Sequence, residues 1–166
     1  DTETTGVGET DRLCQLAYIS KNTDNGQVLK EVNKLYKPAV PISIGAMSVC
    51  HITNKMVENE PEFKKSPEWE DLLIGFGQKE SVMVAHNAKF DIGMLNKEGL
   101  KTPQFICTMK VARWIDDKGD FERVTLQYLR YYYGIEAEAV AHDAMGDVTI
   151  LILVFNELAR LVAAKI

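Results

Sequence analysis

Two stretches near the start of the chain combine hydrophobic and polar residues in a composition typical of strands. Residues 12–20 and 28–36 also mix β-branched and aromatic side chains with polar ones. Between them, residues 22–26 end in an Asn-Gly pair, which favours a tight turn. The pattern therefore predicts an antiparallel β-hairpin.

Later residues combine short apolar runs with helical periodicity. The apolar run 82–85 precedes a helical stretch over 88–98 that Gly99 is suited to end, and a strand over 105–107 precedes a helix over 108–115. These are two strand-to-helix units. Further helices are predicted over residues 43–50, 67–76, 125–133 and 143–164, where Ser66, Thr125 and Asp143 are favourable N-caps.

The last of these helices carries an apolar stripe that we expect to be core. Its members recur at helical spacing: Val148, Leu151, Ile152, Phe155, Leu158 and Val162. A hairpin followed by strand-helix units predicts an α/β fold, with a mixed β-sheet of antiparallel hairpin strands and parallel strands flanked by helices. At 166 residues, the chain fits a single domain, residues 1–166, with one core.

The chain begins with two carboxylates separated by one residue. The stretch reads Asp1-Thr2-Glu3-Thr4-Thr5-Gly6. In a strand, Asp1 and Glu3 would share one face, which can be buried only against a cation. Mg²⁺ is suited to this role, because it binds carboxylates together with the phosphate oxygens of a substrate. The alternative is a solvated, frayed end that holds no site.

Three later residues are candidates for the same site. Asp91 opens the helix after the 82–85 strand, beside the strand's carboxyl end, where open α/β sheets bind ligands. Asp147 lies one turn into the last helix, five residues after His142, so both address one site only if His142 lies on the loop entering that helix. The alternatives are favourable charges in first helical turns and a structural histidine.

The formal net charge of −5 argues weakly against nucleic-acid binding. Two bound Mg²⁺ ions would add +4 and bring −5 to −1, so the objection is soft. Residues 101–130 hold six basic side chains against four acidic ones, which allows a local positive face. An ordinary mixed surface also accounts for these charges.

Composition, at 46% hydrophobic and 26% charged residues, is that of a soluble globular protein. The longest apolar run falls far short of the roughly 18 residues that a membrane span needs, and no signal peptide is visible. The three cysteines, Cys14, Cys50 and Cys107, are odd in number and widely spaced. They predict a reducing, cytoplasmic setting and no zinc site.

Three motifs occur together in one order along the chain. They are residues 1–6, residues 85–91 (Ala-His-Asn-Ala-Lys-Phe-Asp) and residues 142–147 (His-Asp-Ala-Met-Gly-Asp). In order and spacing the chain resembles the DnaQ-like superfamily of 3′-to-5′ exonucleases, in the DEDDh subclass with four acidic residues and one histidine. Residues 41–53 and 106–113 are most similar to the exodeoxyribonuclease X group, followed by the proofreading exonucleases of DNA polymerase III. The chain departs from many relatives at Cys50, where they have histidine.

This resemblance implies a ribonuclease H-like fold and a complete set of site residues. The ligands of two Mg²⁺ or Mn²⁺ ions would be Asp1, Glu3, Asp91 and Asp147, with His142 as the general base. The backbone around Thr4, Thr5 and Gly6 would receive the terminal nucleotide, since glycine permits close approach. Relatives also have several hydrophobic residues before the first motif, so we expect a truncated N-terminal strand, with roughly four to seven residues preceding Asp1.

The expected function is metal-dependent 3′-to-5′ exonuclease action on DNA, releasing nucleoside 5′-monophosphates, with roles in DNA repair or proofreading. The expected partner is nucleic acid with a free 3′ end and no membrane, while a polymerase partner and the oligomeric state stay open. An exoribonuclease or RNA-end trimming enzyme is the main alternative, because the same five residues serve RNA. A non-catalytic nucleic-acid-binding module would not need the full set, and a phosphatase with an aspartyl nucleophile would not need His142.

Overall fold

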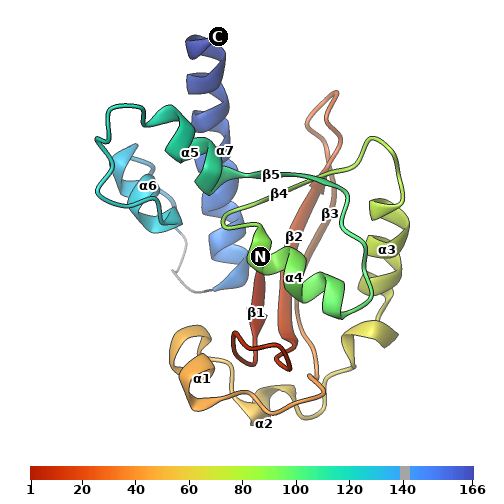
Figure 1. Ribbon diagram of the computed structural model, residues 1–166. Helices are drawn as coiled ribbons and strands as arrows, with labels where there is room; N and C mark the ends of the chain where they lie inside the picture. Colours follow the sequence, from red (N-terminus) through yellow and green to blue (C-terminus); the bar gives the residue numbers. More distant parts are fainter. Residues whose placement is uncertain (139–142) are drawn as a thin grey trace.

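Five strands form two hydrogen-bonded sheets among the residues that the structure describes, 1–138 and 143–166 of a computed structural model (Figure 1). The strands are β1 (Thr2–Thr4), β2 (Leu13–Lys21), β3 (Val28–Leu35), β4 (Val82–Ala85) and β5 (Gln104–Cys107). The helices are α1 (Ile44–Cys50), α2 (Asn54–Val57), the 3-10 helix η1 (Phe63–Lys65), α3 (Pro67–Phe76), α4 (Lys89–Lys97), α5 (Thr108–Ile115), α6 (Leu126–Tyr132) and α7 (Ala144–Lys165).

The sheets combine antiparallel and parallel pairing, as predicted. Strands β1, β2 and β3 are antiparallel neighbours in that order, while β4 and β5 form a parallel pair. The α/β class and the hairpin are therefore confirmed. The combination of antiparallel and parallel strands flanked by helices is confirmed as well, with the two sets forming separate hydrogen-bonded sheets among the described strands. Strand β1 has three residues and pairs with β2, with a shift in register between Glu3 and Thr4. A strand this short leaves few backbone groups to hydrogen-bond with a second neighbouring strand.

The predicted helices begin within one residue of their expected positions, whereas α2 and η1 were not predicted. The side chains of Ser43, Ser66, Thr125 and Asp143 each accept a hydrogen bond from a backbone N–H in the first turn of the following helix. Each cap satisfies a donor that has no partner within its helix.

The β4-to-α4 turn depends on two neighbouring polar residues. Asn87 has a φ of 59°, a left-handed conformation that asparagine tolerates better than most side chains. His86 joins this turn to two other segments, since its Nδ1 lies 3.0 Å from Thr108 Oγ1 and its Nε2 lies 2.8 Å from the carbonyl oxygen of Val124. The turn that precedes Asp91 is thus held to both α5 and the start of α6.

Helix α7 packs against α5, α6 and strand β2. Ile150, Val154 and Leu158 are fully buried with residues of α5 and α6, whereas Val148 packs toward β2. The predicted stripe correctly included Val148, Leu151 and Leu158 but missed Ile150 and Val154, because the helix is covered on more than one side. Its remaining members, Ile152, Phe155 and Val162, are only half-buried. No helix in the described ranges is long and apolar enough to cross a membrane.

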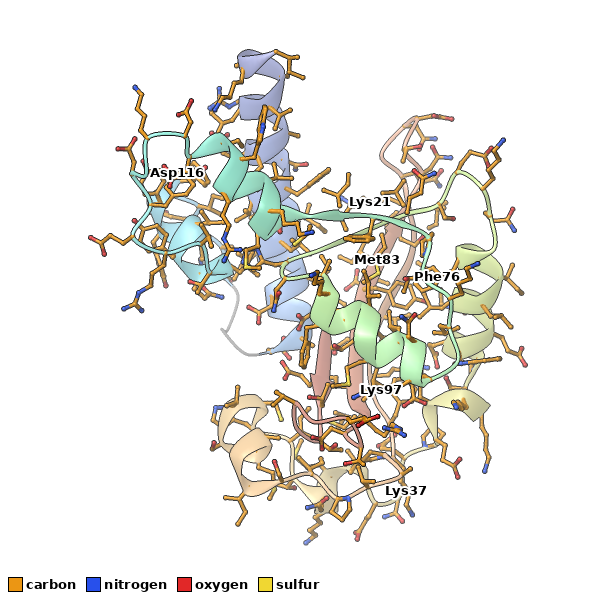
Figure 2. The ribbon with its side chains drawn as sticks, in the orientation of Figure 1. Lys21, Lys37, Phe76, Met83, Lys97 and Asp116 are labelled. Carbon is orange, nitrogen blue, oxygen red and sulfur yellow. The ribbon has the colours of Figure 1, made fainter. Side chains whose placement is uncertain are left out.

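A second cluster joins the hairpin to α3 and α4. Its buried members are Leu13, Leu16, Tyr36, Phe63, Leu95 and Leu100. Met83 of β4 and Phe76 at the end of α3, both labelled in Figure 2, pack against it. Although β1 and β4 are not hydrogen-bonded neighbours, side-chain packing therefore holds the two sheets together.

Candidate active site

Strand β1 alternates buried and half-exposed residues as the Asp-x-Glu pattern predicts. Thr2 and Thr4 are buried, whereas Asp1 and Glu3 are half-exposed. The α-amino group of Asp1 donates to the carbonyl oxygen of Ala17 at 2.9 Å, and the N–H of Ala17 donates back to the carbonyl of Asp1 at 3.0 Å. Asp1 and Glu3 are thus placed on one face by the pairing of β1 with β2.

Asp91 lies in the first turn of α4 and is almost completely buried. Its Oδ1 accepts a hydrogen bond of 2.8 Å from the hydroxyl of Thr2. In Figure 1 the N-terminus lies beside α4. This bond links β1 directly to the turn that follows β4, as the prediction of a shared site for Asp91 and Glu3 requires.

Asp147 approaches the same region from a third element. It lies in the first turn of α7, whose start is capped by Asp143 Oδ2 accepting from the N–H of Gly146 at 3.0 Å. Its Oδ1 accepts a 3.0 Å hydrogen bond from Nε2 of Gln127. The first turn of α7 therefore holds Asp147 against α6.

The electrostatic surroundings of Glu3 include both Asp147 and Asp91. Burial raises the pKa of Glu3 to about 7, and the negative charges of Asp147 and Asp91 push it in the same direction. Glu3 therefore lies in a region of excess negative charge.

The donor set fits a hard divalent cation in its chemistry, because it consists of carboxylate oxygens whose mutual repulsion a cation would relieve. It is not a preformed cage. Within residues 1–138 and 143–166, no three His, Cys, Asp or Glu side chains are spaced to hold a metal ion. His142, the predicted general base, lies outside the described residues.

The three residues predicted to receive a nucleotide have internal hydrogen-bond partners. The hydroxyl of Thr4 donates to the carbonyl of Gly6 at 2.7 Å, and that of Thr5 donates to Asp11 Oδ1 at 2.7 Å. A Cβ on Gly6 would lie 2.5 to 2.8 Å from the carboxylate of Asp11. Glycine thus avoids a close contact with Asp11 inside this loop.

The loop after β1 is tied to α4 by a lysine. Lys97 Nζ donates to the carbonyl of Gly8 at 2.8 Å and to that of Asp11 at 3.2 Å. Figure 2 labels Lys97, which lies on the last turn of α4 above this loop. The loop is consequently held on one side by Lys97 and on the other by the hydrogen bonds of the Asp11 carboxylate to Thr5 and to the Gly8 N–H.

Sequence reasoning missed two residues that touch the predicted ligands, Thr2 and Gln127. Thr2 alternates with the acidic residues of its strand, so its position predicted only burial. Gln127 follows the N-cap of α6 by two residues, and nothing in its surroundings along the chain points to Asp147, which is 20 residues away.

Comparison with known proteins agrees with this fold. A family model described as exonuclease (RNase_T) matches residues 1–155. The chain therefore belongs to this exonuclease family, within the DnaQ-like class of 3′-to-5′ exonucleases.

The individual relatives share only a modest sequence identity with this chain. The PolC-type DNA polymerase III of Staphylococcus epidermidis is 26% identical over 169 residues, which cover 96% of this chain but only 11% of that protein. Exonuclease X in complex with 5′ overhanging duplex DNA is 26% identical, with a TM-score of 0.67 over 95% of this chain and 89% of that one. The nuclease domain of 3′hExo, a DEDDh family member bound to rAMP, is 16% identical, with a TM-score of 0.67 over 96% and 89% of the two chains. These structural likenesses confirm the ribonuclease H-like fold. The chain spans about a tenth of the length of the curated polymerase relatives that it matches.

Proposed function

We propose that the chain is a divalent-metal-dependent 3′-to-5′ exonuclease that hydrolyses DNA and releases nucleoside 5′-monophosphates. The observation that carries the proposal is the convergence of Glu3, Asp91 and Asp147 from β1, α4 and α7 into one negatively charged region. Carboxylates from separate elements cost folding energy when they are brought together, unless a cation compensates them.

Each site residue has a role that follows from its chemistry. Asp1, Glu3, Asp91 and Asp147 would supply carboxylate oxygens to two Mg²⁺ or Mn²⁺ ions. When bound, such ions activate a water and stabilise the 3′ oxygen that leaves phosphorus. The imidazole of His142 would accept the proton of that water, because its ordinary pKa lies near neutral pH.

The remaining polar groups keep this set in place. Thr2 restrains Asp91 through its hydroxyl, and the N-cap of Asp143 fixes the first turn of α7, which carries Asp147. The hydrogen bonds of Thr4 and Thr5 hold the backbone of the loop around Gly6, which we propose as the seat of the terminal nucleotide.

DNA is the favoured substrate because exonuclease X, 26% identical over 95% of this chain, is described in complex with duplex DNA, and the polymerase relatives are DNA enzymes by name.

The three buried cysteines are free, which supports the predicted cytoplasmic setting.

The deciding experiment follows 5′-end-labelled single-stranded DNA, duplex DNA with a 5′ overhang, and RNA of one sequence over time in Mg²⁺, in Mn²⁺ and in excess EDTA. We expect a ladder of products shortened from the 3′ end of DNA, mononucleotide release and no turnover in EDTA. Faster shortening of RNA would favour the exoribonuclease alternative, and turnover in EDTA would contradict the metal requirement.

Matched variants separate the site from the rest of the surface. Asp91→Asn and Asp147→Asn should each abolish nearly all turnover, because carboxylates in a shared metal cluster cannot replace one another. Asp24→Asn, on the exposed hairpin turn, should keep wild-type turnover. Phosphate release from a small phosphomonoester, measured in parallel with malachite green, should be absent if the enzyme is a nuclease rather than a phosphatase.

A further inference from the structure

The side chain of Gln127 on α6 connects two charged groups of opposite sign. Its Nε2 donates to Asp147 Oδ1 at 3.0 Å, and its Oε1 accepts from Arg130 Nη1 at 3.4 Å. Gln127 is half-buried, and Arg130 is only 8% exposed. A polar chain therefore runs from a buried arginine, through one amide, to a carboxylate of the candidate active site.

The chemistry of the end groups leaves the amide one favourable orientation. A guanidinium only donates hydrogen bonds and a carboxylate only accepts them. If the Gln127 amide were reversed, its NH₂ would face the guanidinium of Arg130 and its carbonyl would face the carboxylate of Asp147. Both contacts would then be repulsive, so Arg130 selects the orientation in which Nε2 points at Asp147.

Arg130 is itself fixed by backbone carbonyls. Its Nε donates to the carbonyl of Ile135 at 3.4 Å and its Nη2 donates to that of Ala137, while its own carbonyl accepts from the N–H of Ile135 at 2.9 Å. The guanidinium also lies over the ring of Tyr131, 5.2 Å from its centroid. Because a guanidinium has N–H donors and no acceptor, this anchor presents only donors to Gln127.

We propose that Gln127 is a positioning residue of the nuclease site, which restricts the rotation of the Asp147 carboxylate toward a divalent cation and is itself oriented by Arg130. The catalytic part of this inference rests on the proposed function, whereas the metal-binding part does not. Groups that hold a metal ligand by hydrogen bonds typically contribute 10- to 100-fold to metal affinity or activity.

The test compares Gln127→Met, which is of similar length but has no amide, with Gln78→Met. Gln78 is an exposed glutamine whose Nε2 donates a hydrogen bond of 3.3 Å to the carbonyl oxygen of Ile74, and it serves as the matched control. Mn²⁺ binding is measured by calorimetry on the metal-free protein without nucleic acid, and folding by circular dichroism. We expect Gln127→Met to bind Mn²⁺ about 10- to 100-fold more weakly, and Gln78→Met to bind it like the wild type.

Turnover gives an independent readout. In Gln127→Met, kcat should fall while KM for the oligonucleotide stays within about twofold, because a misplaced ligand affects chemistry more than substrate binding. Wild-type Mn²⁺ affinity in folded Gln127→Met overturns the proposal. If methionine prevents folding, Gln127→Ala provides the same comparison with a better helix former.

A double-mutant cycle tests the role of Arg130. If Arg130 acts through Gln127, the double variant Gln127→Met/Arg130→Met should bind Mn²⁺ within about twofold of Gln127→Met alone. Multiplied effects of the two single variants would show that they act independently, which contradicts the relay. If the wild type is inactive but its Mn²⁺ affinity still depends on Gln127, the exonuclease proposal is overturned and the positioning role is supported. If the wild type is active but neither its Mn²⁺ affinity nor its turnover depends on Gln127, the exonuclease proposal is supported and the positioning role is overturned.

Discussion

Replacing Thr2 by valine isolates the hydrogen bond that joins β1 to α4. The Thr2 hydroxyl donates to Asp91 Oδ1 at 2.8 Å, and the two residues are only 5% and 3% exposed. Valine has nearly the shape of threonine and suits a strand, so the substitution removes the donor and little else. The buried carboxylate would then lose one of the groups that stabilise its charge.

The magnitude follows from burial and charge. A hydrogen bond to a charged group contributes about 1.5 to 3 kcal/mol, whereas the methyl group that replaces the hydroxyl recovers about 0.8 kcal/mol. The net loss is therefore about 1 to 2 kcal/mol. At this chain length it corresponds to a fall in Tm of about 2 to 8 °C.

Urea unfolding and differential scanning calorimetry in EDTA at pH 7 measure this loss. Thr149→Val is the control, because the Thr149 hydroxyl is exposed and donates only to the carbonyl of Met145 within its own helix, so a change within about 0.5 kcal/mol is expected. Thr2→Ser keeps the donor and should be more stable than Thr2→Val. If Thr2→Val unfolds at the same urea concentration as Thr149→Val, the bond to Asp91 does not hold the two elements together.

Three further predictions use other parts of the molecule. His142→Ala should fold and lose a factor of about 10² to 10⁴ in kcat. Part of this loss should be recovered at high pH, because hydroxide then replaces the activated water. An unchanged kcat at pH 7 would show that the histidine has only a structural role. Gly6→Ala should lower the urea midpoint, because the new Cβ meets the Asp11 carboxylate at 2.5 to 2.8 Å, whereas Gly93→Ala, with nothing within 4 Å, should not. Burial lowers the pKa of His86 from its ordinary 6.5, so its contribution to stability should be complete above pH 6.5 and lost as the pH falls below that value. A Tm series against pH should therefore show a steeper acid-side loss for the wild type than for His86→Gln, and parallel curves would contradict this.

Most of the local structure could be predicted because its causes lie within a few residues. The hairpin follows from two stretches of strand-type composition around an Asn-Gly turn. The helix starts follow from N-caps such as Ser66, Thr125 and Asp143, which bond to a backbone N–H three residues later. The pairing of Asp1 and Glu3 on one face is likewise a property of strand geometry. The family follows from the motifs around these acids, and the match over residues 1–155 confirms it.

Partners that are distant along the chain could not be predicted from pattern. Ile150 and Val154 belong to the core only because α5 and α6 cover a second side of α7, and periodicity within one helix carries no information about its neighbours. Strand β1 likewise pairs with β2, and ladder partners are decided between strands rather than within one.

The sequence by itself therefore determined which acids this protein carries, the faces and helix turns on which they lie, and the family to which the chain belongs. Only the tertiary structure decided what holds those acids. Thr2 reaches Asp91 across 89 residues, and Gln127 reaches Asp147 across 20. Both bonds join elements that meet only when the core has packed, because a hydrogen bond requires its two atoms within about 3 Å and local spacing cannot supply that distance.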